Sequence, residues 1–130
     1  MGCRGSWPIC GPEFAEFGGA TSCYILKKGS HALIVDCGTG LYTAGPLLAD
    51  CTVIDVVLTH VHYDHLIGIL NWSVFPRTAQ LRFYARFSAW YGTETFAQFM
   101  RPPFWPYTPR FHDMIDVEVP GTVELDDGLW

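Results

Sequence analysis

The chain has 130 residues, of which 49% are hydrophobic and 16% charged, and its formal net charge is −5 at pH 7. This length and apolar content suit one compact domain, and they exclude a two-domain chain and long disorder. No apolar run approaches the roughly 18 residues that a membrane span needs. The first residues are interrupted by Gly and Pro and lack the basic, then apolar, start of a secretory signal, so we expect a cytoplasmic protein with no membrane partner.

The cysteines argue against a disulfide framework. They are odd in number, form no C-x-x-C pair and all lie within the first 51 residues, at Cys3, Cys10, Cys23, Cys37 and Cys51. Such spacing predicts reduced, mostly buried thiols. An oxidation-prone thiol is the alternative.

The first half of the chain predicts a loop followed by a β-hairpin. Residues 4–20 are rich in Gly and Pro without a sustained period, which is typical of a long loop. Thr21–Lys28 and His31–Asp36 are β-rich runs separated by Gly29-Ser30, the two-residue signal of a hairpin. A short helix is expected within Leu41–Asp50, although Gly45 and Pro46 weaken it.

The middle of the chain alternates between strand and helix signals. Val53–Leu58 is an almost unbroken β-branched run, typical of a strand covered on both faces of an α/β sheet. Leu66–Trp72 has the apolar residues of a helix, Leu81–Ala85 reads as another strand, and Ser88 can cap a helix that extends to about Met100.

The last thirty residues are less regular. Arg101–Arg110 has four prolines in ten residues and is therefore neither a regular helix nor an internal strand. Its aromatic residues are expected to pack over the helix beneath them, or else to line a substrate entrance or stack a base. Ile115–Val119 and Thr122–Leu125 predict a hairpin around Pro120-Gly121.

One segment has the residues of a metal site. Directly after the Val53–Leu58 run comes T-H-V-H-Y-D-H, in which His60, His62, Asp64 and His65 form the pattern H-x-H-x-D-H. Side chains two residues apart in extended backbone point to the same side, and a turn into the following helix brings the last histidine round. Three imidazoles and a carboxylate suit zinc, and also iron or manganese. The segment lies at the carboxyl end of a central strand, where α/β sheets place their sites.

Together with L-I-V-D-C-G-T-G at Leu33–Gly40 and with G-C-R-G-S-W-P, G-P-E-F and F-G-G-A-T-S-C before it, this motif resembles the metallo-β-lactamase-fold hydrolases over essentially the whole chain. The resemblance implies an α/β fold, the amino-terminal half of an αββα sandwich with a mixed β-sheet and flanking helices. It also implies two divalent metal ions, most simply zinc, that share a hydroxide able to attack the substrate.

The resemblance further implies individual roles for the motif residues. His60 and His62 would bind one metal, and Asp64 and His65 the second. Asp64 would also act catalytically, by orienting the nucleophile or moving a proton. Asp36 would brace the ligands from behind. The alternative for Asp36 is an ordinary turn residue at the end of its strand.

Within this family, the opening G-x-R-G-S-x-P and the T-S-C strand are most similar to the subset that contains ribonuclease Z and phosphodiesterases. This implies a phosphodiester substrate, either a small molecule or nucleotide or, as an open alternative, a nucleic acid. Arg4 and Ser6 could meet a phosphate oxygen. Five arginines stand against one glutamate between Arg77 and His112, which could attract such a substrate or form a solvated face.

The ligand set departs from the family because two histidines fall short of the three protein ligands usual for a catalytic zinc. His112 and His31 do not match the missing positions. We therefore interpret residues 1–130 as a partial domain, truncated at both ends and mainly at the carboxyl end. The alternative is an incomplete half-domain that binds metal weakly and has no activity by itself. Redox use of the metals is disfavoured, because positions 62 and 64 are His and Asp where such relatives need a Glu.

Overall fold

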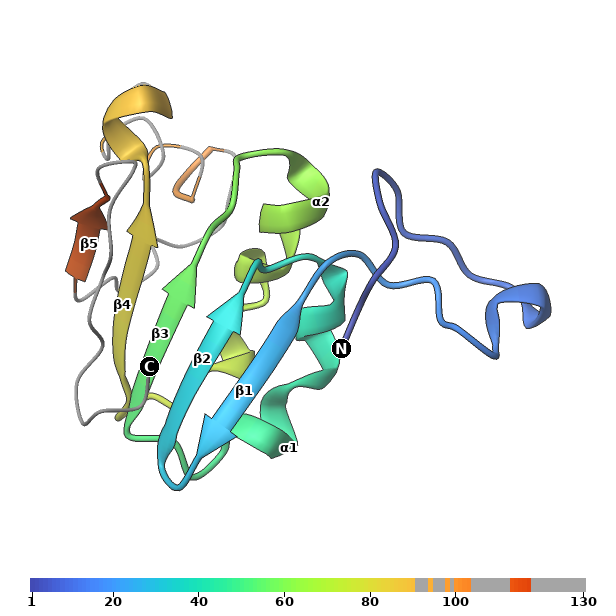
Figure 1. The fold of residues 1–130 in the computed structure, drawn as a ribbon, viewed down its shortest axis with the longest axis horizontal. Coiled ribbons are helices and arrows are strands. Elements are labelled where there is room, and N and C mark those ends of the chain that lie inside the picture. Colours follow the sequence, from blue (N-terminus) through green and yellow to red (C-terminus); the bar gives the residue numbers. More distant parts are fainter. Residues whose placement is uncertain (91–93, 95–97, 99, 104–112, 118–130) are drawn as a thin grey trace.

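The computed structural model describes residues 1–90, 94, 98, 100–103 and 113–117 (Figure 1). Its centre is a five-stranded sheet in the order β1-β2-β3-β4-β5, so that each strand lies beside the strand that precedes it in the chain. The strands are β1 Tyr24–Lys28, β2 His31–Val35, β3 Val53–Val57, β4 Gln80–Ala85 and β5 Asp113–Asp116.

The sheet is mixed, as the sequence predicts. β1 runs antiparallel to β2, with Lys28 opposite His31, and the other pairs are parallel. Gly29 has φ +57° in the connecting turn, a conformation that glycine adopts without steric cost. The predicted hairpin is therefore confirmed. Of the expected sandwich, the described residues form one sheet with its layer of helices.

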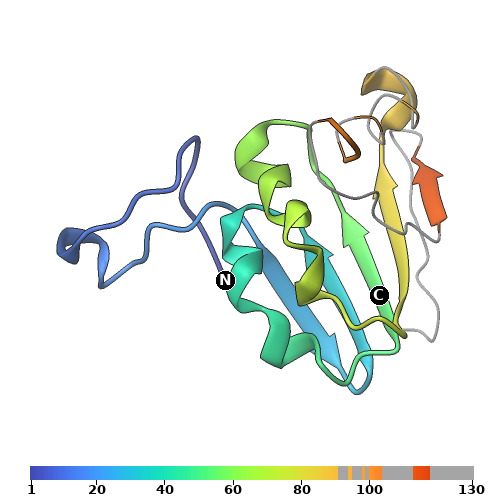
Figure 2. The ribbon, with the colours of Figure 1, turned by 180° about the vertical axis from the view of Figure 1, so that it is seen from behind.

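The helices lie together on one face of the sheet, and Figure 2, turned by 180° from Figure 1, shows this face towards the viewer. They are short: α1 is Gly45–Leu48, α2 is Tyr63–Leu66, and 3₁₀ turns cover Thr39–Thr43, Ile67–Leu70 and Trp72–Val74. The helix predicted over Leu41–Asp50 is divided between the first 3₁₀ turn and α1, which are separated by Ala44. Pro46, in the first turn of α1, has no backbone N–H to donate.

The helix predicted over Leu66–Trp72 begins earlier than expected, at Tyr63 inside the histidine motif, and becomes 3₁₀ from Ile67. The backbone N–H of Gly68 donates to the carbonyl of Cys37 at 2.7 Å, so it does not continue the α-helical hydrogen-bond ladder. A long-range contact thus overrides the local helical pattern.

Towards the carboxyl end, the predictions are only partly within the described residues. The expected helix over Ser88–Met100 is represented by a 3₁₀ turn, Phe87–Trp90, and most of the remainder lies outside the described residues. β5 begins two residues before the predicted Ile115–Val119 strand and is parallel to β4. The second arm of the predicted hairpin, and Phe104, Trp105 and Tyr107, lie outside the described residues.

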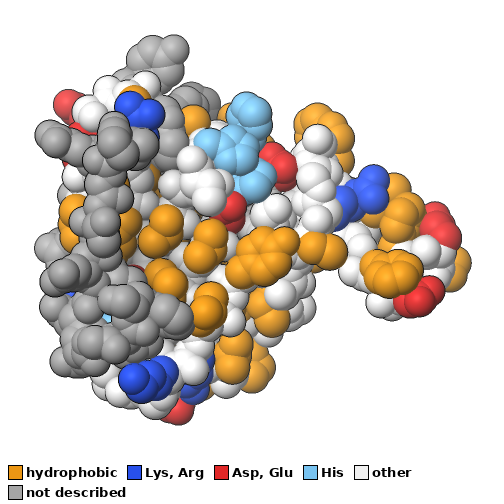
Figure 3. All heavy atoms as spheres, in the orientation of Figure 1, with side chains coloured by type: hydrophobic (Ala, Val, Ile, Leu, Met, Phe, Trp, Pro, Cys, Tyr) orange, Lys and Arg blue, Asp and Glu red, His pale blue; other side chains and the backbone are white. Residues whose placement is uncertain are grey.

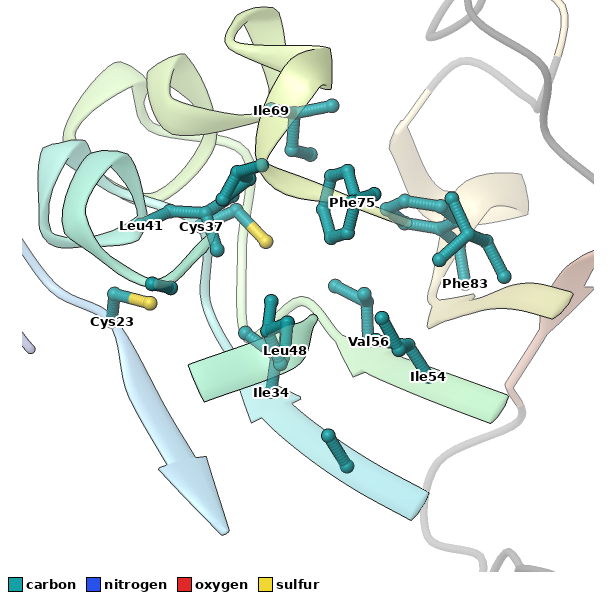
Figure 4. Close-up of a cluster of buried hydrophobic side chains, with 14 of the residues drawn as sticks. Cys23, Ile34, Cys37, Leu41, Leu48, Ile54, Val56, Ile69, Phe75 and Phe83 are labelled. Carbon is teal, nitrogen blue, oxygen red and sulfur yellow. The ribbon is translucent and has the colours of Figure 1, made fainter. Parts of the chain in front are cut away.

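The hydrophobic core fills the space between the sheet and the helices (Figure 4). Ile34, Ile54, Val56 and Phe83 are fully buried on the inner side of the sheet. They belong to one cluster with residues of the covering layer and its loops, which include Leu41, Leu48, Ile69, Phe75, Cys23 and Cys37. This packing positions the loops that follow β2 and β3.

The opposite face of the sheet shows apolar side chains where the described residues leave it open (Figure 3). Tyr24 is 51% and Leu26 41% exposed on β1, and Leu33, Val35 and Val57 are half-buried. Such a patch is typical of a surface that packs against another layer.

The predicted loop over residues 4–20, here called the arm, projects from the side of the sheet (Figures 1 and 2). Two isolated bridges hold its base, between Gly2 and Cys23 and between Arg4 and Thr21. A 3₁₀ turn, Pro12–Phe14, lies at its outer end.

All five cysteines are free, as expected. Cys23, Cys37 and Cys51 are buried, whereas Cys3 and Cys10 are exposed on or beside the arm, so the prediction of mostly buried thiols holds for three of the five. Burial raises the pKa of the Cys23 thiol to about 11. Among the described residues, no helix has the length and apolar character to cross a membrane.

Candidate metal centre

The histidine motif forms a loop at the carboxyl edge of the sheet. We call Thr59–His65 the ligand loop. It follows β3, whose last sheet contact beyond Val57 is the bond from Leu58 N–H to the carbonyl of Tyr84 at 2.9 Å. The loop closes onto the segment after β2, because Cys37 N–H donates to the carbonyl of His65 at 2.7 Å. The ends of two parallel strands therefore set its position.

Within this loop, the imidazole rings gather as the alternation predicts. The ring centroids of His60 and His62 are 4.5 Å apart, and those of His60 and His65 are 4.0 Å apart. Asp64 is nearby, with its Oδ2 3.3 Å from Nε2 of His65. The four residues of the motif thus lie in one cluster.

Asp36 lies behind the cluster and is 4% exposed. Its carboxylate accepts the backbone N–H of Thr59 at 2.8 Å, the Thr59 hydroxyl at 2.9 Å and Nδ1 of His65 at 2.7 Å. One carboxylate thereby connects the first and last residues of the ligand loop.

These bonds also determine which ring nitrogens carry protons. The Thr59 hydroxyl donates to Asp36, so its oxygen accepts from Nδ1 of His60, 3.0 Å away. Nδ1 of His65 donates directly to Asp36. In both neutral rings, Nε2 is left without a proton, and this is the form that binds a metal.

Asp64 is held from the other side by the arm. It is 8% exposed, and its Oδ2 accepts the backbone N–H of Ser6 at 2.7 Å. Burial raises the pKa of Asp64, but the amides of Ser6 and Asp64 and the nearby His65 and His60 outweigh it, so the pKa lies below its ordinary value of 3.8. The carboxylate is therefore ionised at neutral pH.

Two residues that hold the loop have an unusual backbone. Among the described residues other than glycine, only Ser6 and Asp36 have positive φ, at +63° and +59°. This conformation costs free energy for residues with a Cβ and is concentrated at functional sites. Both contacts to the cluster, from the arm and from the end of β2, thus depend on strained backbone.

The protonation of His60 is also shifted. Its pKa is lowered from the ordinary 6.5, first by burial and then by the charges that His65 and His62 acquire when protonated. A lowered pKa keeps the ring neutral to lower pH, which favours its use as a ligand.

The chemistry of these donors fits a divalent metal, but their arrangement does not by itself form a complete site. Within the described ranges, no group of three or more His, Cys, Asp or Glu side chains is arranged to hold a metal ion. The ligand loop therefore fits a divalent metal in the type of its donor atoms and in the orientation of its rings. A complete site needs further ligands.

Other predicted residues are placed elsewhere. His31 is at the amino end of β2 and bonds to Asp55, and Arg82 of the basic stretch pairs with the same carboxylate. Nε of Arg4 donates to the carbonyl of Trp7, and Ser6 meets Asp64 with its amide, so the structure gives both a role in the arm itself. His112 lies outside the described residues.

Sequence reasoning missed the Thr59 hydroxyl and the Ser6 amide as parts of the site. Thr59 stands inside the motif, directly before His60, and a hydroxyl residue at the end of a buried strand is a signal that could have been read. The Ser6 contact uses a backbone donor and therefore leaves no trace in residue identity.

Comparison with known proteins identifies a family and a similar protein. The family model described as "Metallo-beta-lactamase superfamily" matches residues 17–128. The chain is similar to the "Probable metallo-hydrolase YhfI" of Bacillus subtilis (strain 168), with 33% identity over 70 residues. The aligned part is 53% of this chain and 26% of that protein, so the match spans about a quarter of the relative's length. No solved structure matches.

Proposed function

Because the chain belongs to the metallo-beta-lactamase superfamily, we propose that it supplies the ligand loop of a metal-dependent hydrolase that acts on a phosphodiester. The observation that carries the proposal is the cluster of His60, His62 and His65 behind which Asp36 fixes two ring tautomers. The similarity to a protein named as a metallo-hydrolase supports the hydrolytic class.

In this proposal, His60 and His62 hold one divalent ion, and Asp64 and His65 hold a second. Zinc suits the mixed nitrogen and oxygen donors best, and manganese or iron is compatible with them. When bound, such ions supply Lewis acidity and activate water at neutral pH. The remaining ligands would come from residues outside the ligand loop.

The chain's own residues prepare this chemistry. Asp36 orients His65 directly and His60 through Thr59. Asp64 is ionised and fixed at Oδ2 by Ser6, so it can orient a nucleophile or accept its proton. The proposal of a phosphodiester substrate rests on the G-x-R-G-S-x-P and T-S-C segments. The expected cytoplasmic location also stays a prediction.

The described residues favour one alternative. This alternative is a catalytically incomplete half-domain that binds metal weakly and is inactive by itself, and it is supported by the lack of a ready group of three ligands among the described residues. We infer in that case that they are the amino-terminal part of a larger domain.

Titration with zinc and manganese, together with hydrolysis of bis(p-nitrophenyl) phosphate, separates the two proposals. The hydrolase proposal expects two metal ions per chain and activity that falls by at least about a hundredfold in His62→Ala and Asp64→Asn. Asp50→Asn is the matched control, because Asp50 pairs with Lys27 on the surface. Activity that survives both site substitutions contradicts the hydrolase proposal, and tight binding with turnover contradicts the half-domain alternative.

A further inference from the structure

Two exposed aromatic side chains flank the hydrogen bond that joins the arm to the ligand loop. Trp7 follows Ser6, the donor of that bond, and Tyr63 precedes Asp64, the acceptor. Trp7 is 77% and Tyr63 73% exposed. Because each of these residues is the direct neighbour of one end of the 2.7 Å contact, both lie at the rim of the candidate metal centre.

The first turn of the arm, next to its base, holds Trp7 in place. A three-residue turn is closed by the bond from Trp7 N–H to the carbonyl of Gly5 at 2.9 Å, with Ser6 at its centre in the left-handed region. Nε of Arg4 donates to the carbonyl of Trp7 at 2.8 Å, and the Arg4 guanidinium lies 5.3 Å from the ring centroid of Phe14. The backbone of Trp7 is therefore bonded on both its N–H and its C=O.

Such ordering makes the exposure of the indole informative. Tryptophan is usually largely buried, and a ring left in water on an ordered turn gains nothing for the fold. Tyr63 is the first residue of α2, a helix that is itself fixed by the bond from Cys37 N–H to the carbonyl of His65. Two exposed aromatic side chains are thus carried by ordered backbone next to the Ser6–Asp64 contact.

We propose that Trp7 and Tyr63 determine substrate specificity by binding a planar aromatic group of the substrate, such as a nucleobase, next to the phosphodiester. The inference rests on the proposed function for the position of the phosphate. Stacking suits the two rings because every base or aryl group has an apolar face, and it tolerates differences among bases.

The test compares two ligands that share a phosphate and differ in the base. Adenosine 5′-monophosphate and ribose 5-phosphate are titrated calorimetrically into the full chain in the presence of zinc. We expect the nucleotide to bind about tenfold more tightly, in the range of one stacked base. Trp7→Ala should bring the affinity ratio close to one and leave ribose 5-phosphate binding unchanged, while Trp7→Phe should keep most of the ratio.

Phe17→Ala is the matched control, because Phe17 is 82% exposed on the same arm and follows the 3₁₀ turn at its outer end. The ratio should not change in this variant. Equal affinity of the two ligands, no measurable binding of either, or a ratio that survives Trp7→Ala and Tyr63→Ala together would overturn the inference. Loss of hydrolysis alone, with the affinity ratio intact, would contradict the proposed function and leave this inference standing.

Discussion

Two histidine–aspartate pairs lie at opposite edges of the sheet and have different surroundings. At the carboxyl edge, Nδ1 of His65 is 2.7 Å from Asp36, and at the amino edge Nε2 of His31 is 2.5 Å from Asp55. Both carboxylates are buried.

The third partner of each carboxylate makes the difference. Arg82 binds both oxygens of Asp55, at 2.6 and 2.8 Å, so a permanent cation neutralises that carboxylate. In the described part of the chain, no lysine or arginine contacts Asp36, whose partners are a hydroxyl, an amide and an imidazole.

The His31–Asp55 pair, which Arg82 neutralises and which we call the closed pair, is therefore structural and joins β2, β3 and β4 across the sheet. We call the His65–Asp36 pair, which no arginine among the described residues contacts, the open pair. The pair without a cation leaves Nε2 of His65 directed at Asp64, 3.3 Å away, where a divalent ion can supply the missing positive charge. In our proposal, the same two residue types thus serve stability at one edge and metal binding at the other.

The largest expected effect comes from breaking the closed pair. Asp55→Ala should lower the free energy of unfolding by about 3–5 kcal/mol, because it removes a fully buried carboxylate that both His31 and Arg82 bind. Urea denaturation followed by circular dichroism measures the loss. Asp50→Ala, on the exposed pair with Lys27, should cost less than about 1 kcal/mol. Equal losses at the two positions would refute the structural role of Asp55.

Close backbone packing at the carboxyl edge gives the next effect. A Cβ on Gly68 would lie 2.0 Å from the carbonyl oxygen of Gly38, and one on Gly38 would lie 2.2 Å from that of Asp64. Gly68→Ala and Gly38→Ala should each cost about 1–3 kcal/mol in denaturation experiments. Gly45→Ala in α1 meets open space and should be neutral or slightly stabilising. An unstable Gly45→Ala variant would argue against this account.

Replacement of the open pair's carboxylate should affect metal binding more than folding. Asp36→Asn removes the charge that orients His65 and, through Thr59, His60. We expect zinc affinity to fall by about 10- to 100-fold in competition with a chelator. Thr59→Val should have a smaller effect, because it disconnects His60 alone. Unchanged affinity in Asp36→Asn would show that the contact does not tune the ligands.

The smallest effect is a pH dependence of the metal-free chain. The pKa of His60 is lower in the folded state than the ordinary 6.5, so the unfolded chain takes up the proton first. Stability should therefore decrease as the pH falls through 6.5, with a slope of at most about 1.4 kcal/mol per pH unit. In an NMR titration carried out above pH 5, His65→Gln should raise the pKa of His60, whereas Lys27→Gln should leave it unchanged. A stability that rises as the pH falls below 6.5 would contradict the direction of this shift.

Sequence patterns were sufficient for the parts of the molecule that depend on local burial. β2 and β3 follow from apolar runs in which Ile34, Ile54 and Val56 fill the core. The gathering of His60 and His62 follows from their alternation. By contrast, the pattern of the Val53–Leu58 run gives no role to Asp55, because its partner Arg82 lies 27 residues away in sequence.

The rest depends on contacts between distant backbone segments. The early start of α2 and its change to 3₁₀ depend on the carbonyl of Cys37, and the fixing of Asp64 depends on an amide 58 residues before it. The positive φ of Ser6 and Asp36 has no glycine or asparagine to announce it. Backbone donors and strained dihedrals leave no periodicity, so residue types alone do not predict them.

The strand order has a consequence for how the chain assembles at the ribosome. Since each strand of the sheet lies beside its predecessor in sequence, the sheet can extend at one edge while the polypeptide is still emerging. Asp36 ends the hairpin of β1 and β2 and leaves the exit tunnel before the ligand loop. The hairpin that precedes Asp36 can thus form before Thr59 and His65 arrive to bind the Asp36 carboxylate.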